Sequence, residues 1–409
     1  MNEMPPGDGD VMVSTFADVK GVLASKHMAQ ALHVEWDADS VLSDTVLQLH
    51  GPAHRLRRAV ENAVFTRDRF DRYELELLPE VYDAVVPAVA PDGRADLPSL
   101  GKLLTIWLSS VTAGLDVDAR DLATLERLAE FVDLINRGLS LTFTTRDRDE
   151  LKAEVREALV PFADELVLPA IARRRQAIRA GSAVEGSDVL TELVRRQDEL
   201  GLADDVLVRE MGIYLEGGSY TSTLTLIATM HQLFELEKLT PGTIDRFGDD
   251  LVAMQRAVLE GLRLHPIMPV SKRVAEADVA VGDNVFRPGT VVVLDNEAAN
   301  RDTVAFGPDA DRFDPDRTPS AGTARHGIGF GGGPHACIGR ILAVGTPPPA
   351  AGVEPKSNHR VGLVPRLAGM LAADGIRPDP DRQPTLEADV SRVRFETYPV
   401  ILTARQGVS

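Results

Sequence analysis

The only cysteine of this 409-residue chain stands in a loop of unusual composition, FGGGPHACIGR, at residues 330–340. Cys337 follows three consecutive glycines, whose conformational freedom and lack of side chains allow another group to come close. A single thiol can be a small buried hydrophobe, a nucleophile or a metal ligand. His335 is the only local base, and its spacing of two residues does not easily bring its ring onto the sulfur. A flat metal cofactor with an anionic rim explains the set better, because the thiolate would bind the metal while His335 and Arg340 supply positive charge.

Two pairs of polar residues elsewhere have the spacing of one helix face. Glu260 and Arg263 lie three residues apart in DDLVAMQRAVLEGLRLHP, a predicted helix that Pro266 ends. His54 and Arg58 lie four residues apart in PAHRLRRAVENAVF, which also has a helical apolar stripe. Pairs at these spacings commonly lie on solvated helix surfaces and contribute little there. They acquire a function only if the fold buries them.

A long predicted helix without proline, residues 206–236, contains a second group of candidate residues, GGSYTS. Gly217 and Gly218 are expected to open a kink, although a glycine inside a helix costs about 1 kcal/mol. Thr221 offers a hydroxyl beside that kink. Tyr220 precedes it, and a phenol with a pKa of about 10 stays neutral at pH 7. The segment therefore combines a predicted kink with neutral hydroxyl groups at Thr221 and Tyr220.

The residues after the thiol predict a helix that is soon interrupted. A helix starting near Cys337 would direct its unpaired N–H groups toward the sulfur and favour the thiolate. CIGRILAV has a helical pattern, but the proline-rich stretch at residues 345–358 follows it. Three consecutive prolines cannot continue a helix, so this stretch is expected to be an atypical insertion.

Composition and charge exclude several classes of protein. The formal net charge of −18 argues against nucleic-acid binding, because phosphates require clustered Lys and Arg. The N-terminal sequence MNEMPPGDGD lacks the pattern of a secretory signal, and proline or charge interrupts every apolar run, which predicts no membrane span. One cysteine forms no intramolecular disulfide, as expected in a reducing compartment. The expected location is the cytoplasm.

The hydrophobic pattern predicts a fold that is mainly α with small β-sheets. Helices are predicted over residues 75–91, 98–115, 119–138, 147–180 and 187–199. β-Branched runs around Gly-Asp-Asn in DVAVGDNVFRPGTVVVLDN predict hairpin strands, and VRFETYPVIL predicts terminal strands. No linker divides the chain, so a single domain over residues 1–409 is expected, with residues 1–10 flexible.

The cysteine loop resembles the haem-binding signature of the cytochrome P450 family, F-x-x-G-x-H-x-C-x-G. The matching residues are Phe330, Gly333, His335, Cys337 and Gly339. The resemblance implies a single-domain P450 fold in which Cys337 is the proximal thiolate ligand of haem b. Thiolate donation to iron favours cleavage of the O–O bond.

Other residues match the family in the expected order. Glu260 and Arg263 are similar to its E-x-x-R pair, and Arg312 in FGPDADRFDPDR matches the third member of that structural set. The resemblance also implies four groups that bind the two haem propionates: His54, Arg58, Arg273 and His335. Four donors for two carboxylates is reasonable chemistry, because buried charges require partners.

Three features depart from the family pattern. Gly217, Gly218 and Thr221 match the oxygen-binding segment of the central helix, but Tyr220 stands where relatives carry an acid. Glu216 lies five residues before Thr221, about 140° around an α-helix, and is not expected to replace that acid directly. Proton delivery is then rerouted, which we favour, or poorly coupled, or the protein uses another oxidant. The segment before residue 11 is also short for the family's first elements, and the insertion at residues 345–358 alters the proximal surface on which redox partners dock.

The resemblance implies a haem-thiolate monooxygenase that inserts one oxygen atom from O2 into a small organic substrate. Electrons from NAD(P)H are expected through an external ferredoxin or flavodoxin with its reductase. Secondary-metabolite biosynthesis, such as polyketide tailoring, is the expected context, and the substrate could be tethered to a carrier protein. A monomer is expected. Two alternatives remain: a haem-thiolate protein that binds ligands or senses gas without turnover, and a peroxide-driven oxidant.

Overall fold

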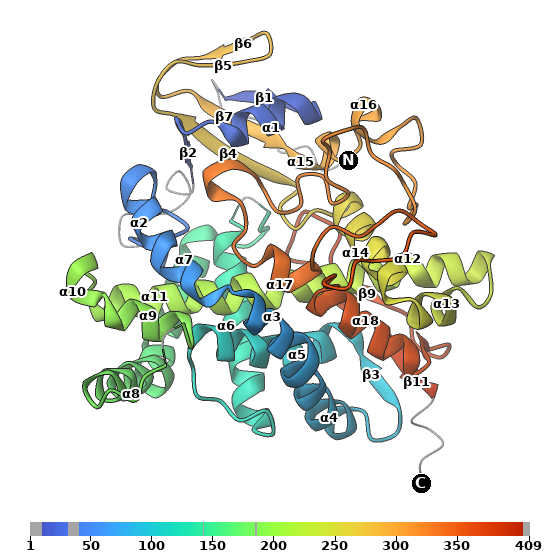
Figure 1. Cartoon of the computed structure of the whole chain (residues 1–409), viewed down its shortest axis with the longest axis horizontal. Coiled ribbons are helices and arrows are strands. Elements are labelled where there is room, and N and C mark those ends of the chain that lie inside the picture. The colour runs from blue at the N-terminus through green and yellow to red at the C-terminus, as the bar shows by residue number, and fades with distance from the viewer. Residues whose placement is uncertain (1–9, 32–40, 142, 185, 404–409) are drawn as a thin grey trace. The chain divides into compact units, whose positions relative to one another are not determined.

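The computed structural model describes residues 10–31, 41–141, 143–184 and 186–403 (Figure 1). The expected flexibility of residues 1–10 falls almost entirely outside these ranges. The chain divides into two compact units, each described here by itself. Unit 1 comprises Met1–Asn2, His33–Thr223 and Asp379–Val400; unit 2 comprises Glu3–Leu32, Leu224–Pro378 and Ile401–Ser409. The expectation of a single domain stays a prediction.

Unit 1 is built mainly from helices. They are α2 (Gly51–Glu61), α3 (Arg67–Arg72), α4 (Leu78–Val89), α5 (Leu97–Ala113), α6 (Leu122–Leu139), α7 (Arg148–Phe162), α8 (Leu168–Arg179), α9 (Val189–Arg195), α10 (Gln197–Leu200) and α11 (Asp204–Leu215). Helix α5 is almost entirely buried. It begins where the Asp96 carboxylate accepts the Ser99 amide at 3.1 Å and ends at Gly114, whose φ of 96° is left-handed. The remaining helices of unit 1 therefore surround an apolar centre.

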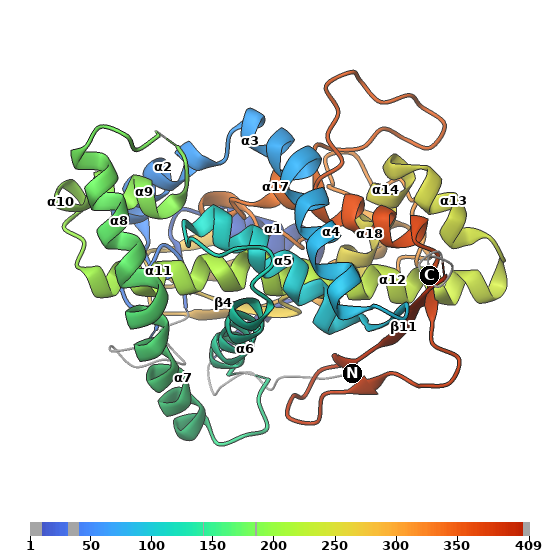
Figure 2. The ribbon, with the colours of Figure 1, turned by 90° about the horizontal axis from the view of Figure 1, so that it is seen from below.

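Three short π-helical turns interrupt these helices: η3 (Tyr73–Leu77), η4 (Ala163–Val167) and η5 (Glu216–Tyr220). The predicted helix at residues 206–236 is observed as α11, η5 and α12 (Thr221–Leu239), which follow one another without a break (Figure 2). Helices α5 and α6 both pack against η5. A π-helical turn thus stands where the sequence predicted a glycine kink, and the boundary between the units falls within α12.

Unit 2 contains a four-stranded sheet in the order β1-β7-β4-β2 (Figure 1). The strands are β1 (Val11–Val13), β2 (Met28–Gln30), β4 (Val270–Ala275) and β7 (Val291–Asp295). Helix α1 (Phe16–Ala24) contributes Val19 and Val22 to the hydrophobic core that this sheet forms. The predicted hairpin is confirmed as β5 (Val279–Val281) and β6 (Asn284–Phe286), joined by a turn at Gly282 with φ of 55°.

The remaining elements of unit 2 are mainly helices: α13 (Thr243–Asp249), α14 (Leu251–Leu264), α15 (Asn296–Ala299), α16 (Thr303–Phe306), α17 (Arg340–Val344) and α18 (Leu363–Ala373), followed by strand β8 (Ile376–Pro378). Helix α17 ends at Gly345, and the proline-rich stretch leads without regular structure to α18. Strands β3 (Arg94–Asp96), β9 (Thr385–Leu386), β10 (Phe395–Thr397) and β11 (Pro399–Leu402) complete the fold. The predicted class, mainly α with small sheets, is confirmed. No helix in the described part of the chain is long and apolar enough to cross a membrane.

Candidate functional site

The cysteine loop in unit 2 has a backbone that only glycine permits at two positions. Gly331 and Gly333 have φ of 64° and 60°, in the left-handed region. A Cβ at Gly333 would also collide with the carbonyl oxygen of Leu23 in α1. The Cys337 amide donates to the Phe330 carbonyl at 3.0 Å and closes the loop. The loop therefore holds an exposed thiol on a rigid backbone.

The helix after the thiol starts later than the sequence predicted. Helix α17 begins at Arg340, with Gly339 as its N-cap, and only a 3₁₀ turn at residues 333–335 precedes the cysteine. The prediction of a helix start near Cys337 is wrong, because the backbone turns at Ala336 into an extended conformation. A Cβ at Gly339 would lie 4.0 Å from the Cys337 sulfur, so larger side chains there would extend over the thiol.

Arg273 of strand β4 is a buried cation without a carboxylate partner among the described residues. Its guanidinium donates to the Lys272 carbonyl at 2.8 Å, and no salt bridge joins it. Burial lowers the pKa of Arg273 to about 10, and no neighbouring acid opposes that shift. A buried charge without a counter-ion requires an anionic partner. This arginine fits a ligand that carries a carboxylate, as the propionate assignment requires.

A half-buried histidine of this region, His326, escaped the sequence reasoning. The His326 ring lies edge-on to Phe330, with 5.0 Å between ring centroids. Burial and the nearby Arg340 lower the pKa of His326 to about 4, so the ring is neutral at pH 7. His335 is half-buried in the same loop. A histidine five residues before a glycine run carries no spacing signal, which is why only the fold places it beside Phe330.

Glu260 and Arg263 of α14 form the centre of a buried ionic network. Arg263 is fully buried, and two of its nitrogens donate to the Glu260 carboxylate at 2.7 Å each. The third member is Arg317, whose Nε donates to Glu260 at 3.0 Å and whose Nη1 donates to Asp309 at 2.7 Å. The prediction of Arg312 is wrong: its side chain is exposed, and only its carbonyl accepts from the two buried arginines.

In unit 1, His54 and Arg58 lie one turn apart on α2, as predicted. His54 is buried, and Arg58 is half-buried. Burial, followed by the charges of Arg58, His50 and Arg55, lowers the pKa of His54 to about 4. This end of α2 is thus electropositive with a neutral imidazole in it. Both features suit an anionic ligand group.

The π-helical turn η5 places Thr221 and the two glycines differently from an α-helix. The Thr221 hydroxyl donates to the Gly217 carbonyl at 2.6 Å. A Cβ at Gly217 would meet no atom within 4 Å, whereas one at Gly218 would collide with the Ser109 hydroxyl of α5. Gly218 is therefore required by packing, and Gly217 borders open space. In a π-helical turn, residues five apart in the sequence lie about one full turn apart. Glu216 and Thr221 are therefore not separated by the angle of about 140° that an α-helix would give them.

Tyr220 is buried in a polar network that sequence spacing could not reveal. Its hydroxyl accepts from Arg394, whose guanidinium also lies 5.5 Å from the centroid of the phenol ring. Arg394 further donates to the Asn136 side chain at 3.2 Å and to the Glu387 carboxylate. Burial raises the pKa of Tyr220, and Arg394 opposes this only in part. The phenol is therefore neutral, and its oxygen points toward an arginine.

Glu216 belongs to the same region. It is buried and accepts from the Asn136 amide at 2.8 Å, and burial raises its pKa. Its side chain is thus engaged with α6. The expectation that Glu216 does not directly replace the missing acid rested on a separation of about 140°, which the π-helical turn removes, so it stays a prediction.

A pair of buried carboxyl groups joins α2 to α11. The Glu210 carboxylate accepts from Arg57 at 3.0 Å and from the Val46 amide at 3.1 Å. Neither oxygen of Glu61 has a hydrogen-bond partner among the described residues. Burial and then Glu210 raise the pKa of Glu61 well above its usual range. One arginine cannot balance two buried carboxylates, so Glu61 is the member that keeps its proton.

Comparison with known proteins agrees with this arrangement. A family model described as Cytochrome P450 matches residues 249–344, which include Glu260 and Cys337. Nocardicin C N-oxygenase from Nocardia uniformis subsp. tsuyamanensis is 30% identical over 354 residues, which cover 84% of this chain and 80% of that protein. The chain belongs to the cytochrome P450 family.

Other relatives extend the comparison. The mycinamicin IV hydroxylase/epoxidase of Micromonospora griseorubida is 27% identical over 83% of this P450 chain and 79% of its own. The crystal structure of CalO2 superposes with a TM-score of 0.72 at 22% identity, covering 96% of this chain and 91% of that one. The P450BioI structure, solved in complex with an acyl carrier protein bearing a fatty acid, gives 0.72 at 18% identity and covers 95% and 91%. This P450 is therefore a haem-thiolate monooxygenase, an oxidoreductase with a small-molecule substrate and a redox partner.

Proposed function

We propose that Cys337 would supply the thiolate ligand of haem b and that His54, Arg58, Arg273 and His335 would bind its propionates. The observation that carries this assignment is Arg273, a buried cation for which the described residues offer no carboxylate. Bound haem supplies the activation of O2 and the transfer of one oxygen atom to the substrate. Gly333 lets the loop pack closely, Gly339 keeps bulk away from the sulfur, and Phe330 packs against the His326 ring.

On the oxygen side, Thr221 and the glycines of η5 act together. Gly217 borders open space, and Gly218 allows α5 to approach. The Thr221 hydroxyl donates to the Gly217 carbonyl, and a hydroxyl oxygen is also able to accept a hydrogen bond. Tyr220 is neutral and bound to Arg394, so it holds the helix in place rather than passing protons. These contacts support proton delivery through Thr221 and water.

The substrate class is inferred from the relatives. Nocardicin C N-oxygenase and the mycinamicin IV hydroxylase/epoxidase are named for small organic metabolites. We infer a secondary metabolite, hydroxylated or similarly oxidised, with a carrier-protein tether as one form of presentation. A ferredoxin or flavodoxin with its NAD(P)H-dependent reductase supplies the electrons, and the enzyme works as a cytoplasmic monomer.

The decisive experiment is the spectrum of the reduced CO complex. We expect the red-shifted Soret band of a thiolate-ligated haem in the wild type and its loss in Cys337→Ser. Arg273→Gln is expected to lower the haem content, whereas Arg287→Gln should not, because Arg287 is exposed and paired with Asp278. A normal CO band in Cys337→Ser would refute the ligand assignment.

Turnover assays then separate the two alternatives. Product formation with NAD(P)H and surrogate redox partners supports the monooxygenase. Product with hydrogen peroxide alone indicates a peroxide-driven oxidant. A normal CO band without product under either condition favours a ligand-binding or gas-sensing protein.

A further inference from the structure

A small recess in unit 1 is formed by three segments that are fixed to one another through their backbones. They are the end of α6, residues 143–146 and residues 389–394. The Thr145 amide donates to the Asp389 carbonyl at 3.0 Å, and the Ser391 amide donates to the Phe143 carbonyl at 2.8 Å. A β-bridge joins Thr144 to residue 390 between these two bonds. The recess is therefore a built feature of the fold.

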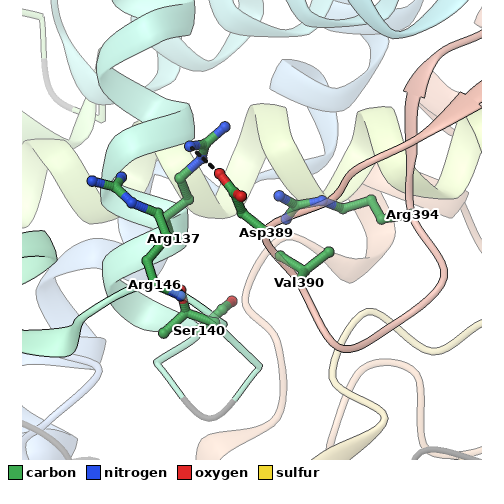
Figure 3. Close-up of a pocket in the computed structure, with 7 residues that line it drawn as sticks. Arg137, Ser140, Arg146, Asp389, Val390 and Arg394 are labelled. Carbon is green, nitrogen blue, oxygen red and sulfur yellow. Dashed lines mark hydrogen bonds and ion pairs between the residues drawn. The ribbon is translucent and has the colours of Figure 1, made fainter.

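The recess is rich in arginine (Figure 3). Its lining comprises Arg137, Ser140, Thr144, Arg146, Asp389, Val390 and Arg394. Three guanidinium groups thus surround it, and Asp389 is the one carboxylate among these lining residues. Arg146 is satisfied by Glu154, to which it donates at 3.0 Å, and an Arg394 nitrogen donates to Glu387. The recess is distinguished by its remaining N–H donors, the guanidinium of Arg137 and the Nε of Arg394.

Two of those donors lack a good acceptor among the described residues. Arg394 is 6% exposed, and its buried Nε has no hydrogen-bond partner. The one ion pair of Arg137 is a 3.9 Å contact with Asp389, and both side chains are partly exposed. A contact of that length between exposed groups contributes little. A buried N–H without an acceptor, by contrast, is costly, so this arrangement favours a bound anion or water.

We propose that this recess binds an anionic oxygen group of a ligand, a carboxylate or a phosphate monoester, through Arg137 and Arg394. Guanidinium groups match both anions geometrically, because their N–H donors lie in one plane. Asp389 competes with the ligand, since in Figure 3 its carboxylate lies toward the Arg137 guanidinium. The anion displaces Asp389 from Arg137 when it binds. The inference rests on the proposed function only in identifying the anion as part of a substrate or of its carrier.

The test uses three probes of equal chain length on the haem-loaded enzyme: octanoate, octyl phosphate and octan-1-ol. Isothermal titration calorimetry at constant ionic strength measures each dissociation constant and requires no turnover. We expect one anion to bind about tenfold or more tightly than the alcohol, because a charge-assisted hydrogen bond contributes enough free energy for that difference. Preference for octanoate identifies a substrate carboxylate, and preference for octyl phosphate identifies a phosphate-bearing arm.

The variants identify the site and control for general charge. Arg137→Gln is expected to remove most of the preference for the anion, and Asp389→Asn is expected to increase it. Arg127→Gln is the matched control: it lies on the same helix, is exposed, and pairs with Glu165 outside the recess. No preference for either anion, or an equal loss in Arg137→Gln and Arg127→Gln, would overturn the proposal. The CO spectrum is independent of these titrations, so failure of the haem assignment is recognised separately.

Discussion

Arg317, rather than Arg312, is the third member of the ionic network around Glu260, and this difference can be measured. Replacing Arg317 by Ala removes its bond to the Glu260 carboxylate and its bond to Asp309. It also leaves the Phe306 carbonyl, which accepts from Arg317 at 2.6 Å, without that donor in a buried place. Replacing Arg312 removes only an exposed side chain.

The magnitude follows from burial. Removing one partner of a buried, hydrogen-bonded ion pair typically costs about 3–5 kcal/mol. Arg263 still holds Glu260 through two bonds, so we expect Arg317→Ala to lie near the lower end of that range. An exposed substitution such as Arg312→Ala changes stability by at most about 0.5 kcal/mol. The two variants should therefore differ by about 2.5 kcal/mol or more.

Urea unfolding of the haem-loaded protein, followed by circular dichroism, measures the free energy of unfolding, and absorbance gives haem per chain. Arg317→Lys keeps the charge but not the planar fork of donors, so an intermediate loss is expected. Equal stability of the Arg317→Ala and Arg312→Ala proteins, or a larger loss for Arg312→Ala, would refute the reasoning.

The other predictions concern the central helix and the buried carboxyl pair. Thr221→Ala is expected to uncouple the enzyme, so that NAD(P)H consumption persists while hydrogen peroxide replaces product; unchanged product per NAD(P)H would contradict the role of Thr221. Tyr220→Phe should cost about 1–2 kcal/mol of stability, because Arg394 loses a buried acceptor, yet leave coupling unchanged. Increased peroxide release in Tyr220→Phe would instead place the phenol in proton delivery. Folding raises the pKa of Glu61, so the stability that this group contributes is fully present below its usual pKa of 4.5. That stability is lost as pH rises toward the pKa of Glu61 in the folded protein. Glu61→Gln should therefore reduce the fall in unfolding free energy as pH rises above about 4.5, and an unchanged slope would exclude a protonated Glu61.

The cysteine loop, the hairpin and the end of α17 could be predicted from the sequence because adjacent residues determine them. The cysteine signature occupies ten adjacent residues, and at Gly331 and Gly333 within it the backbone adopts left-handed conformations. The hairpin turn at Gly282 and the end of α17 at Gly345, just before the prolines, follow from the conformations that those residues allow. In each case a residue and its immediate neighbours determine the backbone, so no tertiary contact was needed for the prediction.

Only the tertiary structure decided which distant groups meet. Arg312 and Arg317 stand in one short loop, and nothing in their spacing reveals which side chain turns inward; the loop's path past Asp309 makes it Arg317. Tyr220, which stands at the position of the family's acid, is 174 residues from Arg394. No local sequence pattern could therefore predict the buried hydrogen bond between them. Long-range contacts depend on the packing of whole elements, which the periodicity of one segment does not encode.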